Sequence, residues 1–233
     1  MSKSPTSRRR RANEVKTRAH SPSNMFTMCR VIGCGRTARA GTQDGLDTRL
    51  CRVHADHYSR HGSPYKGSYA AKQIAPYRKL ALDWLSAHRD DATVRNALDR
   101  VTGLYTAAGA HVEAFRLRGL SPEARAKAAW ARLRKAKVDP LRVVAAWLTV
   151  EMIIRDDPQP ETKLEFKQVQ AAKLVHKMAS GTHKSWGEGA AVTSLHVYPR
   201  SRGRVLRYIG ADLQQASELA WEQFKAETKR TGP

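Results

Sequence analysis

The sequence predicts a mainly α-helical protein, with a disordered basic arm, a small cysteine-containing module and a helical domain that carries one β-hairpin. Three observations support this prediction. Three cysteines and a histidine lie close together, apolar residues recur at helical spacing from about residue 70, and positive charge is concentrated near the N-terminus. We expect the arm at 1–24, the module at 25–68, a helical hairpin at 70–119 and the helical domain at 121–229.

The N-terminal arm is basic and poor in apolar residues. Residues 1–80 hold 17 basic and 4 acidic residues, a net charge of +13, against +8 for the rest of the chain. Such a composition cannot bury enough apolar surface to become ordered. A basic arm gains affinity for a polyanion by releasing counterions from phosphates, and a solubilising tail is the alternative. The run that would contact phosphates is Arg8, Arg9, Arg10 and Arg11.

The cysteines and one histidine have the spacing of a metal site, C-x4-C-x16-C-x2-H. The residues are Cys29, Cys34, Cys51 and His54. Zinc prefers four sulfur or nitrogen ligands in a tetrahedron, and two close pairs joined by a loop supply them. An odd number of cysteines cannot pair fully as disulfides, and the N-terminus lacks the apolar stretch of a signal peptide. We therefore expect structural Zn²⁺, with His57 close enough to compete with His54.

The sequence around these ligands resembles the small zinc-binding segment of phage and mobile-element proteins, which often precedes HNH endonuclease domains. The resemblance covers residues 29–64 and includes the closing turn His61, Gly62 and Pro64. Ala55 replaces the usual aromatic residue, and His57 stands where an arginine is usual. The resemblance implies the same four ligands and an origin in a phage, a plasmid or another mobile element.

Helical periodicity begins near residue 70. Pro76 suits the first turn of one helix, and a second follows with apolar residues in a heptad pattern from Val94 to Phe115, ending at Gly119. We expect these two helices to form an intramolecular hairpin, and a homodimer through the Val94–Phe115 seam is the alternative.

Three further helices are expected in the helical domain. Ser121 and Pro122 begin the first, and Asp139 caps the second, which runs from Leu141 to about Ile154 with almost no polar side. This second helix should be the centre of the core. The third is expected at 161–179.

Two strands are predicted next, at 192–198 and 204–209, followed by a last helix at 212–228. Helices followed by a hairpin with a basic tip are typical of a winged helix-turn-helix. In that arrangement the 161–179 helix would enter the major groove, and the wing would contact phosphates. A helical domain with a solvated basic hairpin is the alternative. The wing residues are Arg200, Arg202 and Arg204.

No complete catalytic set is recognised. The histidines and asparagine of an HNH nuclease do not follow the cysteine segment. His196 and Arg200 suggest a tyrosine recombinase, but their spacing is H-x3-R and no tyrosine follows Leu213. We therefore do not expect an enzyme. No stretch has the length of a membrane span, and we expect a cytoplasmic, nucleoid-associated protein.

We favour a zinc-containing DNA-binding accessory or regulatory protein, with RNA as the other nucleic-acid partner. The alternatives are a protein-interaction or assembly factor in which zinc is only a structural staple, and a remnant nuclease-associated protein. The salt dependence of binding distinguishes nucleic-acid binding from protein binding, because phosphate contacts weaken steeply with salt and apolar contacts do not. Besides the arm and the wing, the contact candidates are Arg36, Arg39, Arg52, Arg60, Lys163 and Lys167.

Overall fold

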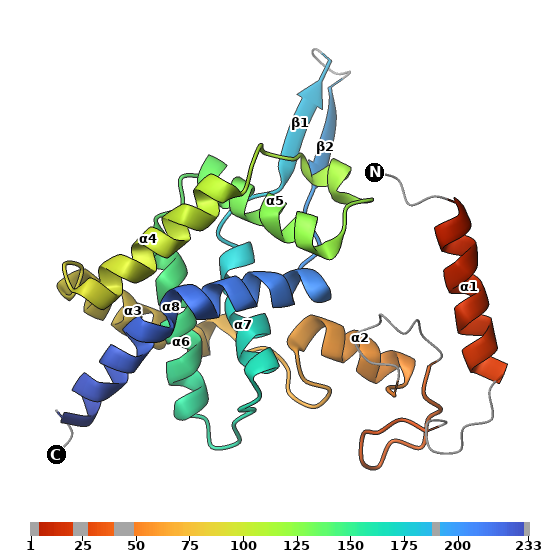
Figure 1. The fold of residues 1–233 in the computed structure, drawn as a ribbon, viewed down its shortest axis with the longest axis horizontal. Helices are drawn as coiled ribbons and strands as arrows, with labels where there is room; N and C mark the ends of the chain where they lie inside the picture. Colours follow the sequence, from red (N-terminus) through yellow and green to blue (C-terminus); the bar gives the residue numbers. More distant parts are fainter. Residues whose placement is uncertain (1–4, 21–27, 40–48, 188–191, 231–233) are drawn as a thin grey trace.

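The computed structural model describes residues 5–20, 28–39, 49–187 and 192–230. This part of the chain is mainly helical and carries one two-stranded antiparallel hairpin, which confirms the predicted fold class (Figure 1). The elements are α1 (Pro5–His20), α2 (Arg52–His61), α3 (Ala71–Ala87), α4 (Ala92–Ala107), η1 (Ala114–Leu117), α5 (Pro122–Lys135), α6 (Pro140–Arg155), α7 (Leu164–His176), β1 (Thr182–Trp186), β2 (Thr193–Val197) and α8 (Arg204–Arg230).

Residues 5–20 of the N-terminal arm are helical in the structure, where the sequence predicts disorder. Helix α1 spans Pro5–His20. Pro5 occupies the first position, where its missing N–H costs no intrahelical bond, and arginine, alanine and lysine all favour helix. The prediction of disorder rested on the charge composition of this segment. Its residues nevertheless have a high helix propensity, which accounts for the helix in the structure.

Helix α6 is the centre of the core, as predicted. The Asp139 carboxylate accepts the N–H of Leu141 at 2.9 Å and caps its N-terminus. Every residue from Val143 to Ile154 is buried, because α3, α4, α7 and α8 all pack around this helix. Burial of each large aliphatic side chain contributes about 1.5–3 kcal/mol relative to exposure.

The predicted hairpin at 70–119 is wrong in its packing and in its length. Helix α3 packs chiefly on α6, and α4 packs chiefly on α8, rather than on each other. Pro76 lies inside α3 and not in its first turn. Helix α4 ends at Ala107, shortly before Gly109, whose φ of +73° stops the helix, and Phe115 lies in η1.

The Val94–Phe115 seam is largely used within the chain. Val94, Val101 and Tyr105 are buried against the other helices of the core. These three side chains are therefore not available to a second copy, while Phe115 is 39 % exposed, and the homodimer stays a prediction.

The predicted strand at 204–209 is wrong, because Arg204 begins α8 instead. The residues Val205, Leu206, Ile209 and Leu213 are buried at helical spacing, and a short apolar run does not distinguish strand from helix. At Gly210, α8 approaches α7 so closely that a Cβ would lie 2.5 Å from Gln168. Glycine here permits the tight packing of the two helices.

The hairpin consists of β1 and β2, with Thr182 opposite Val197 and Trp186 opposite Thr193. It projects from the helical body at the top of Figure 1. The predicted strand at 192–198 is present as β2, and it pairs with Thr182–Trp186, where the sequence predicts no strand. The winged-helix interpretation fails on two points: the arginines follow β2 rather than lie at the tip, and no residue from 165 to 176 of α7 is fully exposed. Helix α7 therefore has no free face for a major groove.

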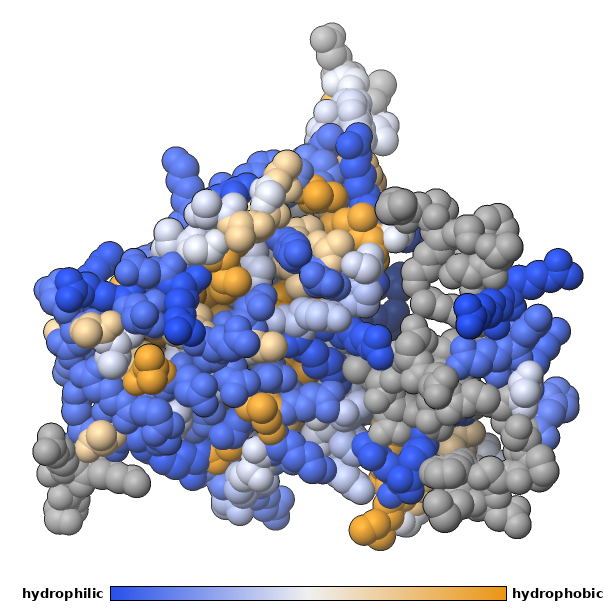
Figure 2. All heavy atoms as spheres, viewed as in Figure 1, coloured by the Kyte–Doolittle hydropathy of each residue, from blue (hydrophilic) through white to orange (hydrophobic). Residues whose placement is uncertain are grey.

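Among the described residues, no helix is long and apolar enough to cross a membrane. The face shown in Figure 2 is mostly hydrophilic, with apolar residues scattered over it.

Candidate metal centre and its basic surroundings

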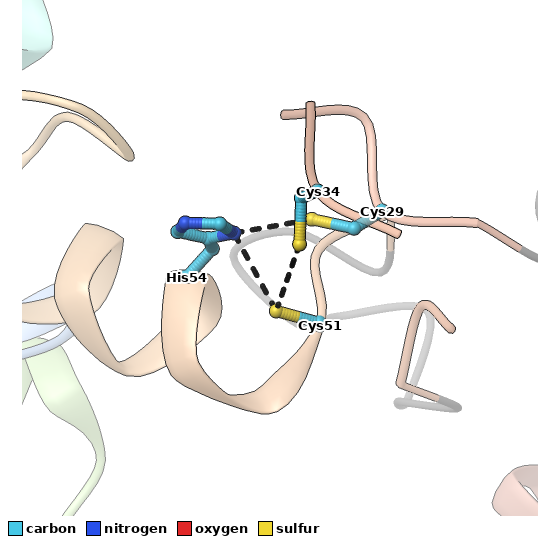
Figure 3. Close-up of side chains that lie close together, drawn as sticks. All are labelled: Cys29, Cys34, Cys51 and His54. Carbon is cyan, nitrogen blue, oxygen red and sulfur yellow. Dashed lines mark hydrogen bonds between the residues drawn. The ribbon is translucent and has the colours of Figure 1, made fainter. Parts of the chain in front are cut away.

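Four side chains from two separate segments meet at one point, as Figure 3 shows. The Nδ1 atom of His54 lies 3.3 Å from Sγ of Cys29 and 3.5 Å from Sγ of Cys51. The Sγ atoms of Cys34 and Cys51 are 3.9 Å apart, and the four ligand atoms all lie within 4.8 Å of one another. The cysteines are free thiols, since a disulfide needs about 2.05 Å.

These distances match the edges of a zinc tetrahedron. With Zn–S of about 2.3 Å and Zn–N of about 2.0–2.1 Å, tetrahedral angles place two sulfurs about 3.8 Å apart and a sulfur and a nitrogen about 3.6 Å apart. The observed separations of 3.9, 3.5 and 3.3 Å lie within about 0.3 Å of these values. The four residues can therefore hold a metal ion such as zinc, as the spacing predicts.

A tight turn positions the first two ligands. The N–H of Cys34 donates to the Val31 oxygen at 3.0 Å, and Gly33, the third residue of this turn, has φ of +77°. That conformation favours glycine. The N–H of Cys29 donates to the Arg36 oxygen at 2.9 Å, which ties the two ends of the turn together.

The N-terminus of α2 positions the other two ligands. Cys51 is the N-cap residue, and His54 lies in the first turn. The main-chain N–H of His54 lowers the pKa of the Cys51 thiol, as expected where the free N–H groups of a helix face a developing thiolate. This helix end therefore favours the deprotonated form of the Cys51 sulfur, which is the form that binds a metal.

The module has a small apolar core of its own. Cys29, Val31, Leu50, Cys51 and Ala55 form one buried cluster, and Leu50 is fully buried. The cluster is separate from the main core of the helical domain. It is small, so a metal ion would supply much of the stability of this segment.

His57 does not compete for the site. Its Nδ1 atom lies 2.9 Å from the Ser63 oxygen, and its ring lies 4.4 Å from the His61 ring. His54 is the histidine that faces the sulfurs, which resolves the choice that the sequence left open.

Two other clusters of polar side chains resemble metal sites but have ordinary structural roles. His88, Asp91 and Glu227 come together, yet Trp84 donates to Glu227 at 2.8 Å and Gln223 donates to Asp91 at 2.7 Å, so hydrogen bonds already occupy the carboxylates. No pattern in the sequence predicted that these three residues come together.

His183 and His196 face each other across the hairpin, with their Nδ1 atoms 2.8 Å apart. They form a cross-strand pair on an exposed part of the molecule.

The closing turn of the module docks on α7. Gly62 has φ of +79°, and a Cβ there would lie 2.9 Å from the Glu165 oxygen and 3.0 Å from the Phe166 Cα. Ser63 is fully buried and donates to Glu161 at 2.8 Å, while Gln170 donates to the His61 oxygen at 2.8 Å. Only the resemblance pointed to His61, Gly62 and Pro64, and it did not predict this contact.

Arg207 of α8 holds the same end of α2. Its guanidinium donates to the oxygens of Tyr58 at 2.9 Å and Ser59 at 3.2 Å, and to the Glu165 carboxylate at 2.6 Å. The Gly203 N–H also donates to the Ser59 oxygen at 2.8 Å. Because the last carbonyls of a helix have no partner within it, these donors stabilise the end of α2.

The predicted nucleic-acid contacts fall into three groups. Arg36, Arg39, Arg52 and Arg60 are exposed on the module, and Arg9 and Arg10 are exposed on α1. The side chains of Arg8 and Arg11 lie outside the described residues.

Lys163 is exposed just before α7, but Lys167 forms an ion pair with Glu151 at 2.8 Å and is a structural residue. Arg200, Arg202 and Arg204 are exposed, and the Gly203–Ser59 bond brings their loop next to α2.

Positive charge accumulates where α2 meets α7. Burial, followed by the charges of Lys173, His57 and Arg60, lowers the pKa of His61 to about 4. Burial and the neighbouring Lys177 and Arg60 lower the pKa of Lys173. Nearby cations destabilise further positive charge here, which is the electrostatic condition that favours a bound anion.

Fold and site together define a mainly helical protein with a Cys3His cluster on a small basic module. Comparison of the chain with protein-family models, with curated proteins and with solved structures gives no match.

Proposed function

We propose that this chain is a nucleic-acid-binding accessory protein, with DNA favoured, in which a structural zinc ion folds the basic module. The cluster supports a structural metal, because four protein ligands fill a tetrahedron and leave no open position for water or substrate. The resemblance of residues 29–64 to a segment of phage and mobile-element proteins supports the same class of protein.

The arrangement of charge around the metal cluster carries the proposal. Arg36, Arg39, Arg52 and Arg60 are exposed, and within the described part of the chain none of the four forms an ion pair. Solvated guanidinium groups on a small rigid module are the groups that displace counterions from phosphates.

The expected mode of binding is contact with the phosphate backbone. Helix α7, the recognition helix of the winged-helix interpretation, is enclosed by α2, α6 and α8. The exposed arginines instead lie on the turn before α2, on α2 itself and on the loop that precedes α8. Contacts of this kind position a protein without reading base identity.

A salt series tests the proposal. Metal-loaded protein is titrated with random DNA duplex, and with RNA as competitor, between low and physiological salt. We expect log Kobs to fall linearly with log salt, with a slope of about −0.9 for each phosphate neutralised. The double variant Arg52→Ala/Arg60→Ala should reduce that slope by about 2, while the matched exposed pair Arg95→Ala/Arg142→Ala should not. Equal slopes in both variants, or no binding, would contradict the proposal.

Deletion of residues 1–20 tests the arm separately. Binding at low salt should weaken because the run Arg8–Arg11 is lost, and the metal content should stay unchanged because the four ligands begin at Cys29. Unchanged binding would make α1 a tail with no part in the interaction.

One observation favours the second candidate function, a protein-interaction factor. Trp186 is 52 % exposed and Tyr198 is 64 % exposed, both at the hairpin. Large exposed aromatic side chains are enriched where proteins meet. A protein partner captured through the hairpin would bind almost independently of salt and would be lost in Trp186→Ser, whereas nucleic-acid binding on the module would be retained.

A further inference from the structure

A recess of about 70 Å³ lies between α5, η1 and the loop that precedes α8, away from the metal module. Its apolar lining includes Val112, Leu117 and Val205. Its polar lining is strongly basic. Its polar residues are His111, Arg125, Arg132, His176, Thr182 and Arg200.

Arg132 is the unusual residue of this recess. It is only 7 % exposed, and among the described residues it forms no ion pair. One nitrogen donates to the His176 oxygen at 2.8 Å, but the buried Nε has no partner. Burying a charge without a counter-ion is costly, so a cation at this position calls for an anion.

Arg125 is a second arginine of this kind. It lies seven residues, or about two turns, before Arg132 on the same helix. Its Nε is also buried without a partner. Arg200 adds a third guanidinium from the loop before α8. His176 adds no charge to the recess at pH 7, because burial and the nearby Arg132 lower the pKa of its imidazole to about 4 and leave it neutral.

A second, more open recess of about 330 Å³ shares His111, Arg132 and Thr182 with the first. It adds two more cations, Lys135 and Lys184. The one carboxylate that lines either recess is Glu113, and it is already engaged, since Thr182 donates to it at 2.6 Å and His111 lies 3.9 Å away. The protein residues around Arg132 therefore leave a large excess of positive charge.

We propose that the first recess binds the phosphate group of a small organic phosphate, whose body lies in the adjoining second recess. Guanidinium groups match phosphate oxygens in charge and in planar geometry, and several cations suit a dianion better than a single carboxylate. The second recess gives room for the body, and Val112, Leu117 and Val205 add apolar contact beside the phosphate. This site is separate from the metal module and does not depend on the proposed function.

Binding of adenosine 5′-monophosphate to the full-length, metal-loaded protein tests the proposal, with inorganic phosphate as a second probe and adenosine as the control that lacks the phosphate. Calorimetry and thermal unfolding should show that the monophosphate binds and raises the melting temperature, while adenosine does neither. Arg132→Met and Arg125→Met should each weaken binding at least tenfold, because each removes a charge-assisted donor. Lys127→Met, a 62 % exposed residue of the same helix, should bind like the unchanged protein.

Arg125→Met tests the proposal even if Arg132→Met does not fold, because Arg125 is only partly buried. A protein that binds neither phosphate probe, or variants that keep their affinity in a folded state shown by circular dichroism, would overturn the proposal.

A free nucleotide and the 5′ end of a nucleic-acid strand carry the same phosphate group. Single strands with a 5′-phosphate or a 5′-hydroxyl distinguish these two sources. A preference for the 5′-phosphate that disappears in Arg132→Met assigns the recess to a strand end. Equal binding of both strands, with monophosphate binding retained, assigns it to a free nucleotide. Salt-dependent binding of 5′-hydroxyl duplex should be the same in Arg132→Met, so this result and the test of the proposed function can fail independently.

Discussion

Arg207 donates a hydrogen bond of 2.9 Å to the main-chain oxygen of Tyr58, and its guanidinium lies 5.1 Å from the centre of the Tyr58 ring. The two residues are 149 positions apart, on α8 and α2. Through this pair the long C-terminal helix of the domain holds the helix that carries two of the four metal ligands. The module is therefore coupled to the helical domain although it has its own small core.

Replacing Arg207 should weaken that coupling. Arg207→Met keeps the length of the side chain but removes the donors to Tyr58, Ser59 and Glu165. We expect the free energy of unfolding to fall by about 1.5–3 kcal/mol, since a partly buried carboxylate and two helix-end carbonyls each lose a charge-assisted hydrogen bond while keeping another donor. Urea unfolding measures this loss. Arg204→Met, on the exposed first turn of the same helix, is the control, and an equal loss in both variants would show that the contacts with α2 contribute little.

Gly62 should tolerate no side chain. Gly62→Ala places a Cβ 2.9 Å from the Glu165 oxygen at a φ of +79°, so both contact and backbone conformation oppose it. The left-handed conformation alone costs about 1–2 kcal/mol for a non-glycine residue, and we expect a total loss of about 2 kcal/mol or more. Gly67→Ala is the matched control, because nothing lies within 4 Å of its Cβ position. Thermal unfolding of the two variants compares them, and similar melting temperatures would contradict the close docking of α2 on α7.

Cys51→Ser should release the metal and unfold residues 28–61 locally, while the helical domain keeps its structure. The small cluster around Leu50 cannot replace the free energy of metal binding, but the main core does not include it. Metal analysis and circular dichroism measure the two effects.

Two histidine variants provide the comparison for this prediction. His54→Asn should lose the metal as well, whereas His57→Asn should keep one metal per chain, because His57 faces the Ser63 oxygen. Loss of all helical signal in Cys51→Ser would refute the picture of a separate metal module.

His176 should make the protein less stable in acid. Its pKa is lowered to about 4 in the folded state, first by burial and then by Arg132, and lies near 6.5 in the unfolded state. The unfolded state therefore binds more protons between these values, and stability falls as the pH drops from about 6.5 to about 4. The contribution lost is about 2–3 kcal/mol at pH 4.

The variant His176→Gln should remove this part of the pH dependence. Urea unfolding at pH 7 and pH 4.5, in buffer without phosphate, gives the change in the free energy of unfolding for each protein. Loss of metal in acid affects the stability of both proteins alike. His196→Gln, on the exposed hairpin, is the control. The same pH dependence in all three proteins would show that His176 is protonated in the folded state without cost.

Local signals were readable in the sequence. The spacing of Cys29, Cys34, Cys51 and His54 predicts the cluster, because the ligands come from a short turn and one helix end, whose geometry depends on neighbouring residues alone. Asp139 and the mostly apolar stretch after it likewise predict the buried helix α6.

Features that depend on distant partners were decided only by the tertiary structure. The run from Arg204 to Ile209 has no decisive period, and its packing against α7 makes it helical rather than extended. The sequence predicts that α7 is a recognition helix, but in the structure α2, α6 and α8 enclose it. Arg132 is one of several cations along α5, and only the fold buries it without a carboxylate among the described residues. The sequence alone thus determined the short-range chemistry of the metal ligands and helix caps, because covalent spacing sets it. Burial, contacts between helices and the partners of charged groups were decided by packing between residues far apart in the chain.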